Sequence, residues 1–452
     1  MKRLFTLWFA ALLFLTACGG QQKTEQAENP KPLYETGSPA EAVLETTEKS
    51  GEKIELMLGV LDNSAQHKQR SEIYSLVGEF NNQNAQYHVT IKNYREDGKT
   101  LEQGRQSLVT ELLAGGGPDM LVFDNLSPLP LIAKGLLLDL DTLADGDPGV
   151  TEKNLVIWNA LHEYGRMYLI APRFILDTVK CLPETKDDIE KWDIQTYLEM
   201  EAALDDGTEM IYHMTPQNFV ERLAVRYLPN AMDLEMGTCS FDNEEFVEIL
   251  AAACRVGSYD SEKNDTEAWK DGVFQTASQR IAAGQLLFCA EWAASVEDLA
   301  YNRTITDGAE LVYIGWPAPD GESGGRLVLQ MPIGICSRTS QPQGCWELLK
   351  YILKHPRMDQ NHPGFPCDLT KYQLMVAQTC DSLSNYQDLV RMDANNLLQR
   401  IRAYGQMGFY DEAVMNIILE EADAMFEGNA TAEEVARRVQ DRASLYMMEQ
   451  YG

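Results

Sequence analysis

The sequence contains none of the short motifs that hold a metal ion or a nucleotide. Its nine cysteines and six histidines are scattered, without the C-x-x-C or H-E-x-x-H spacing of zinc sites. A Walker motif is missing as well, and the glycines of GGGP at 115–118 lead into a predicted strand. A phosphate cradle would need them to open a helix. We therefore expect no metal and no cofactor.

Basic residues are scarce. Lys and Arg number 38 against 69 Asp and Glu, which gives a formal net charge of -31. Binding to nucleic acid needs clustered Lys and Arg to neutralise phosphates, so nucleic acid is not an expected partner. Strong acidity of this kind favours solubility outside the cell.

Long apolar runs are also missing. The first apolar stretch, Leu4–Phe14, follows Lys2 and Arg3 and is much shorter than the ~20 residues that cross a bilayer. A short apolar segment behind basic residues is typical of a secretion signal, here residues 1–17. No later stretch reaches about 18 apolar residues, so we expect no spanning helix in the exported chain.

The signal ends in a cysteine. Leu15, Thr16 and Ala17 before Cys18 resemble the lipobox of bacterial lipoproteins. The resemblance implies that the thiol of Cys18 is lipidated and anchors the protein to the cell membrane on its extracellular face. An ordinary signal peptide with a chance cysteine is the alternative.

The segment after Cys18 has almost nothing apolar to bury. Residues 19–51 are rich in Gln, Glu, Lys, Pro, Ser and Thr, a composition that predicts disorder. A flexible chain of this length has a root-mean-square span of roughly 30 Å. Residues 18–51 are thus predicted to form a lipidated linker between the membrane and a folded body.

Eight cysteines remain after Cys18. An exported location permits disulfides, but a body of this size does not need them for stability. Cys254 and Cys289 lie in apolar runs, which favours buried positions. We expect mostly free, buried thiols.

The folded body begins with alternating strands and helices. Apolar residues alternate over 54–58 and again over 87–91, whereas those of 73–80 recur with helical spacing. A second helix covers 108–113, and the strand MLVF at 120–123 follows it. This β-α-β-α-β order predicts a parallel-rich sheet flanked by helices, with ligands beyond the carboxyl ends of the strands. Polar residues at those ends are Asp62, Asn63, Asp124 and Asn125.

Several segments in order resemble one known family. It is the extracellular solute-binding proteins of ABC importers, family 1, which take up sugars and oligosaccharides. The matching segments span about residues 52–450, and they are EFNNQNAQYHVTI, LLAGGGPDMLVF, IAKGLLLDLDTL, QRIAAGQLLFCAEW, PIGICSRTSQPQGCWELLKYIL and EEADAMFEGNATAEEVARRVQDRASLYMME.

The resemblance implies a two-lobed, periplasmic-binding-protein-like α/β fold of type II. It places crossings between the lobes at YLIAP (168–172) and YIGWP (313–317), where proline cannot extend a central ladder. The implied boundaries put 52–171 with 317–355 in lobe 1, and 172–316 with 356–452 in lobe 2. Such crossings act as hinges.

A sugar site needs flat side chains for the C–H faces of the ring and carboxylates or amides for its hydroxyls. Trp292, with Glu291, is expected in a loop after the strand QLLFCA, while Trp316 lies on a crossing. Trp158 and Arg173 complete the candidates. Ordinary packing is the alternative for each tryptophan, and a solvated charge for each polar residue.

The expected function is therefore binding of a sugar or oligosaccharide by a monomer, which closes on its hinge and delivers the solute to ABC permease subunits. A secreted hydrolase is an alternative, because GESGG at 321–325 fits G-x-S-x-G. A nucleophile elbow must open a helix, however, and a strand pattern follows this motif. A sensor or peptide-binding lipoprotein of the same fold is the other alternative.

Overall fold

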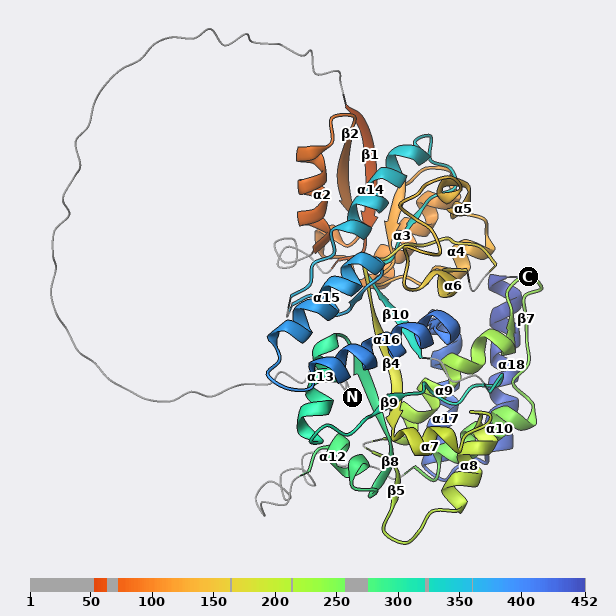
Figure 1. Cartoon of the computed structure of the whole chain (residues 1–452). Helices are drawn as coiled ribbons and strands as arrows, with labels where there is room; N and C mark the ends of the chain where they lie inside the picture. The colour runs from red at the N-terminus through yellow and green to blue at the C-terminus, as the bar shows by residue number, and fades with distance from the viewer. Residues whose placement is uncertain are drawn as a thin grey trace, which may run out of the picture. The chain divides into compact units, whose positions relative to one another are not determined.

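All described strands belong to a four-stranded sheet, a seven-stranded sheet or a two-stranded hairpin. The structure is a computed structural model (Figure 1) that describes residues 53–62, 72–162, 165–212, 214–256, 275–321, 325–359 and 361–451. These residues fall in one unit, Ser50–Gly452. None of the helices within these ranges is long and apolar enough to span a membrane. The predicted signal, Cys18 and the linker to residue 51 lie outside the described residues.

The four-stranded sheet has the order β11-β3-β1-β2. Strands β1 (Ile54–Val60), β2 (Tyr87–Asn93) and β3 (Met120–Val122) are parallel, and β11 (Ile333–Ile335) is antiparallel to β3. The predicted β-α-β-α-β order and parallel pairing are thus confirmed.

The helices α2 (Glu72–Gln83), α3 (Leu101–Leu113) and α14 (Pro342–Lys354) accompany this sheet (Figure 1). The buried face of α2 has the predicted helical spacing. The helix ends at Gln83, and near this end the Asn81 side chain bonds both the N–H and the carbonyl of Val89 on β2, at 2.8 and 2.9 Å.

The seven-stranded sheet is built around β4 (Arg173–Cys181). The strand pairs antiparallel with β8 on one side and β10 on the other. The other members of this sheet are β5 (Glu209–Tyr212), β8 (Leu286–Ala293), β9 (Val312–Tyr313), β10 (Arg326–Gln330), β12 (Phe365–Pro366) and β13 (Gln406–Met407).

The chain passes between the two sheets at two prolines. Ile170 still bridges to Ile333 of the four-stranded sheet, and β4 begins directly after Pro172. The return lies between β10 and β11, where Met331 has a left-handed φ of 56° and Pro332 follows. The continuous strand pattern of 326–335 is thereby two strands in different sheets.

The second crossing was expected at 313–317. Tyr313 instead still pairs with β4, and so does all of β10. The lobe boundaries, 52–171 with 317–355 and 172–316 with 356–452, remain a prediction.

Two long helices, α17 (Glu412–Phe426) and α18 (Ala432–Gln450), follow near the end of the chain. Gly428 takes a left-handed conformation after α17 (φ 76°), and Thr431 with Glu434 forms a capping box for α18. The remaining elements are η1 (Glu96–Gly98), α4 (Leu129–Ala133), α5 (Asp141–Ala144), α6 (Trp158–Leu161), α7 (Pro183–Asp187), α8 (Ile194–Ala202), α9 (Pro216–Ala231), β6 (Met232–Asp233), β7 (Thr238–Cys239), α10 (Glu244–Ala253), α12 (Ala277–Ala282), α13 (Val296–Ile305), α15 (Leu369–Ser382) and α16 (Gln387–Tyr404).

Two large apolar cores hold these elements. The first joins the sheets, since Leu56 and Ile333 belong to it together with Phe174 and Leu327. The second lies among α9, α10, α17 and α18. Burying one large apolar side chain in these cores stabilises the fold by about 1.5–3 kcal/mol relative to leaving it in water.

The cysteines of the described residues are free, as predicted. Six of them are buried, but Cys254 is exposed. Its predicted burial is wrong because Cys254 is the C-cap of α10, one residue beyond the buried end of that helix at Ala253.

Candidate functional site

A row of polar and aromatic side chains crosses the middle of the seven-stranded sheet. Asp177 on β4 lies opposite Arg326 on β10 and opposite Trp292 on β8. Directly opposed residues of antiparallel strands share one face, so these three side chains lie in a line on that face. Arg326 Nη1 is 3.5 Å from Asp177 Oδ2.

Arg222 of α9 covers this row. Its guanidinium forms an ion pair with Asp177, and lies 5.4 Å from the ring centre of Trp292 and 5.2 Å from that of Trp316. Trp292 is 48% exposed, whereas Asp177 is fully buried. The indole of Trp292 is therefore about half exposed and lies beside the Arg222 guanidinium, whose partner Asp177 is not accessible to solvent.

Trp316 contacts the row through Asp177. It is buried, and its Nε1–H donates to Asp177 Oδ1 at 3.0 Å. Its predicted contact with a ligand remains a prediction, because in this structure the ring packs in the second core and holds the Asp177 carboxylate in place.

A groove of about 1030 Å³ adjoins the row through Tyr410. The ring of Tyr410 lies under the Arg326 guanidinium at 5.3 Å. Helix α4 forms one wall of the groove, and β6, β7 and the segment 409–411 form the other. We call it the junction groove, and its aromatic lining consists of Tyr168, Phe409, Tyr410 and Tyr451.

The predicted polar residues at the carboxyl ends of β1 and β3 come together. Asn125 Nδ2 reaches the carbonyl of Leu61 at 3.5 Å, and its own carbonyl accepts Arg105 Nε–H at 2.7 Å. Desolvation raises the pKa of the Asp124 carboxyl, and the negative charge of Asp62 nearby raises it further. Asn63 lies outside the described residues.

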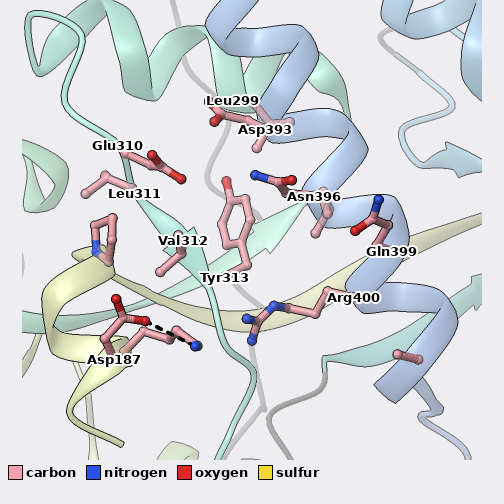
Figure 2. A pocket seen from close by; sticks show the side chains of 14 residues that line it. Asp187, Leu299, Glu310, Leu311, Val312, Tyr313, Asp393, Asn396, Gln399 and Arg400 are labelled. Carbon is pink, nitrogen blue, oxygen red and sulfur yellow. Dashed lines mark hydrogen bonds and ion pairs between the residues drawn. The ribbon is translucent and has the colours of Figure 1, made fainter.

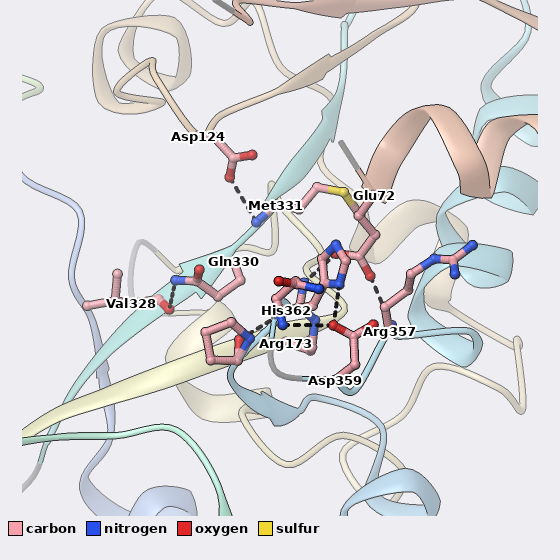
Figure 3. A network of polar contacts seen from close by, with 11 residues as sticks. Glu72, Asp124, Arg173, Val328, Gln330, Met331, Arg357, Asp359 and His362 are labelled. Carbon is pink, nitrogen blue, oxygen red and sulfur yellow. Dashed lines mark hydrogen bonds and ion pairs between the residues drawn. The ribbon is translucent and has the colours of Figure 1, made fainter. Parts of the chain in front are cut away.

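Asp124 itself faces the return crossing. Its Oδ1 accepts the Met331 N–H at 2.8 Å (Figure 3). The residue as a whole is exposed, but its carboxyl is desolvated by the surrounding protein, which raises its pKa from 3.8 to about 6.

Arg173, the first residue of β4, is held in a buried network (Figure 3). One end of its guanidinium forms an ion pair with Glu72 of α2, and Nη1–H donates to the Pro363 carbonyl at 2.5 Å. Glu72 also accepts the Arg357 N–H at 2.9 Å. The two charged side chains are only 4% and 5% exposed. We call this ion pair, which joins α2 to β4, the junction pair.

The loop expected at 291–292 is wrong. Strand β8 runs on to Ala293, so Glu291 and Trp292 point to opposite faces of the sheet. Glu291 forms an ion pair with Lys180, which donates to Asn302 Oδ1 at 3.1 Å. A role of Glu291 in binding stays a prediction, but it does not share the face of Trp292.

Trp158 is a further predicted residue that is not part of the row on β4. It begins α6, packs against the first core and has its ring 4.4 Å from that of His162. Among the described candidates, the structure thus gathers Asp62, Asp124 and Asn125 near the connection at Met331, and Trp292 with Trp316 around Asp177. We call the face of the seven-stranded sheet that carries Asp177, Arg326 and Trp292 the β4 face.

Four residues of the row were missed by the sequence analysis, namely Asp177, Arg222, Arg326 and Tyr410. One signal was available for Asp177, because RFILDTVKC places a carboxylate inside an apolar strand. A charge in that position must find partners, since an unpaired buried carboxylate is costly. The partners come from α9 and β10 and have no spacing that identifies them.

A second cavity, of about 520 Å³, lies between α7, β9, α13 and α16 (Figure 2). Its charges are largely matched: Lys186 pairs with Asp187 at 3.2 Å, and Asp393 holds Arg303 at 2.6 and 2.7 Å. None of the described candidate residues lines it.

Comparison of the sequence with known families and proteins gives no relative. No family model matches it. No curated protein matches it either.

Solved structures, in contrast, share the fold. The chain is similar to the sugar-binding protein MalE from Xanthomonas citri, at 12% identity and a TM-score of 0.53, over 88% of this chain and 98% of that one. It is also similar to a protein from Synechococcus sp. MITs9220 assigned as an oligosaccharide periplasmic-binding protein, at 15% identity and a TM-score of 0.51, over 88% and 100% of the two chains. The predicted α/β, periplasmic-binding-protein-like fold with parallel-rich sheets and flanking helices is confirmed.

Proposed function

We propose that the protein binds a sugar or oligosaccharide on the β4 face and delivers it, unchanged, to the permease of an ABC importer. The observation that carries this proposal is the half-exposed indole of Trp292 beside Arg222 and its buried partner Asp177. The fold shared with MalE of Xanthomonas citri, which is named as a sugar-binding protein, supports it.

The chemistry of the row suits a carbohydrate. The exposed face of Trp292 is available to the C–H bonds of a sugar ring, and Arg222 offers N–H donors to ring hydroxyls. Asp124, Asn125 and Asp62 provide acceptors near the connection at Met331. Ligand sites of this kind combine apolar contact area with a few oriented polar groups.

Binding is expected to change the relation between the two sheets. In this proposal the connections at Pro172 and Pro332 act as hinges, and a solute that contacts both sides favours the closed state. Shifting the closed state from 1% to 99% requires roughly 5.5 kcal/mol of differential binding. A few aromatic and hydrogen-bonding contacts are sufficient for that.

The location follows from the first residues of the sequence. We infer that Cys18 is lipidated on the extracellular face of a bacterial membrane, and that residues 19–51 tether the folded unit. Mass spectrometry of the protein purified from membranes tests this inference. A diacylglycerol-modified N-terminal Cys18 is expected, and an unmodified cysteine would contradict it.

The alternative function, a secreted hydrolase, differs from solute binding in that it releases a product. The strand β10 that follows 321–325 does not support a nucleophile elbow there, although Ser323 itself lies outside the described residues. Incubation of the full chain with oligosaccharides should leave them intact by chromatography. Release of shorter sugars would favour the hydrolase instead.

Calorimetric titration of the full chain with a panel of oligosaccharides and short peptides tests the proposal directly. At least one oligosaccharide is expected to bind, and Trp292→Ala should weaken it at least about tenfold, as expected for an aromatic anchor. The matched control is Tyr301→Ala on α13, an aromatic side chain that is 57% exposed. Binding of peptides alone, or equal loss in both variants, would contradict the proposal.

A further inference from the structure

Three polar contacts connect the α3–α4 region with the segment from 410 to the end of α18. Arg105 of α3 bonds Glu412 of α17, Ser127 Oγ–H donates to the Tyr410 carbonyl at 3.3 Å, and Lys134 Nζ–H donates to the Gln450 carbonyl. The first partner of each contact is in or next to a helix beside the four-stranded sheet. The second partner belongs to the segment that carries α17 and α18. The second partner of each contact lines the junction groove or is adjacent in sequence to a residue that lines it, so we call this side of the groove its rim.

The contact of Arg105 is the most specific of the three. Its two terminal nitrogens donate to the two carboxylate oxygens of Glu412, at 2.7 and 3.0 Å. Nε–H donates in addition to the Asn125 carbonyl at 2.7 Å, next to Asp124 of the candidate site. A bidentate pair of this geometry is stronger and more directional than a single ionic contact.

Neither side chain is needed by its own helix. Asp411 caps α17 by accepting the N–H groups of Ala413 and Val414, and Thr100 with Gln103 forms a capping box for α3. Glu412 in the first turn of α17 is favourably placed for the helix dipole, but a glutamine keeps the helix capped. The pair can therefore be broken without removing the stabilisation of either helix end.

We propose that Arg105 and Glu412 form a rim latch that favours the closed state and so sets solute affinity without touching the solute. The inference rests on the proposed function. A contact made only in the closed state lowers the free energy of that state, and a solute that selects this state then binds more tightly. With 22% and 50% of the two side chains exposed, the contact is weak enough to open.

The test uses the full chain with Glu412→Gln, Arg105→Gln and the double variant. The oligosaccharide that binds best in the calorimetric panel is expected to bind about three- to fivefold more weakly to each single variant, the range of one surface ion pair. The double variant should lose no more than the single variant Arg105→Gln, because both changes break the same contact. The matched control is Arg442→Gln, whose arginine bonds Glu420 and Glu421 at 2.7 Å within the α17–α18 pair.

A second readout needs no solute. Small-angle X-ray scattering of the solute-free variants should give a larger radius of gyration for Glu412→Gln than for wild type, and an unchanged one for Arg442→Gln. Melting temperatures should be equal for these two variants. If no oligosaccharide binds wild type, the proposed function fails while scattering still decides the latch. Unchanged affinity and unchanged scattering in Glu412→Gln would overturn it.

Discussion

Two ion pairs connect a helix beside the four-stranded sheet with an element outside that sheet. They differ mainly in how deeply their side chains are buried. The junction pair, Glu72 with Arg173, lies among the crossings with both side chains almost completely buried. The rim latch, Arg105 with Glu412, lies at the edge of the junction groove with both side chains partly exposed. Both are arginine–carboxylate contacts; the first joins α2 to β4, and the second joins α3 to α17.

The difference in burial changes what each pair can do. A buried charge that loses its partner remains in a medium of low dielectric constant, so breaking such a pair is severely destabilising. An exposed charge returns to water, and the loss is small and depends on salt. We infer that the junction pair maintains the fold at the hinge, while the rim latch adjusts an equilibrium between folded states.

The largest predicted effect follows from breaking the junction pair. Glu72→Gln should lower the free energy of unfolding by about 3–5 kcal/mol, because it leaves the Arg173 guanidinium buried without its counter-charge. Urea unfolding followed by circular dichroism measures this loss. The matched change Glu412→Gln should cost less than about 1 kcal/mol. Similar losses in the two variants would remove the distinction between the pairs.

A second buried carboxylate extends the comparison to the candidate site. Asp177→Asn removes the negative charge that faces Arg222 and Arg326, and should cost about 1.5–3 kcal/mol of stability, the range for hydrogen bonds to charged groups. The Trp316 Nε1–H keeps an acceptor in this variant, so the indole should stay in place. Solute binding should weaken by more than the loss of folding stability alone would explain, because the Arg222 guanidinium is no longer held by the Asp177 carboxylate. A variant that unfolds less readily than wild type would be inconsistent with this account.

Asp124 is an intermediate case, an exposed residue whose desolvated carboxyl has a pKa raised to about 6. The folded protein holds this proton more tightly than the unfolded chain does, so the contribution of Asp124 to stability decreases as the pH rises from 3.8 to about 6. Asp124→Asn keeps an acceptor for the Met331 N–H and cannot ionise.

The stability of Asp124→Asn relative to wild type should therefore increase over this pH range and be constant above it. Thermal unfolding at a series of pH values checks the sign. Glu412→Gln, which removes the partly exposed carboxylate of the rim latch, serves as the control. A relative stability of Asp124→Asn that decreases with rising pH would show that its carboxylate is favoured in the fold.

The smallest predicted effect concerns salt. Raising the ionic strength from about 0.01 to 1 M shortens the screening length from about 30 to 3 Å, which weakens the exposed rim latch and leaves the buried pair almost unaffected. Wild-type affinity for the solute should fall by a fewfold, and that of Glu412→Gln should fall less. Equal salt dependence in the two proteins would argue against an electrostatic latch.

Much of the four-stranded sheet could be predicted from local pattern. Its strands and helices have clear periods of two and 3.6 residues, and the polar residues that follow β1 and β3 were found because parallel strands end at one edge. The capping box at Thr431 is equally local.

The row on β4 could not be predicted in this way, because its members come from elements far apart in the sequence, including β4, α9, β8 and β10. Polar residues within β8 were taken as a loop, although Glu291 faces a buried lysine and Trp292 faces the opposite side. The crossing expected at 313–317 stays a prediction, whereas the structure has a connection between the two sheets at Met331 and Pro332. Two residues, Met331 with a left-handed backbone and Pro332, separate β10 from β11, and of these two signals only the proline is visible in the sequence.

The most direct test of the account is fluorine NMR of the full chain labelled with 5-fluorotryptophan. The Trp292 resonance is identified by its absence in Trp292→Phe. Adding the oligosaccharide selected by calorimetry should shift this resonance strongly and change that of buried Trp346 little. A saturating solute that leaves the Trp292 signal in place would contradict binding on the β4 face.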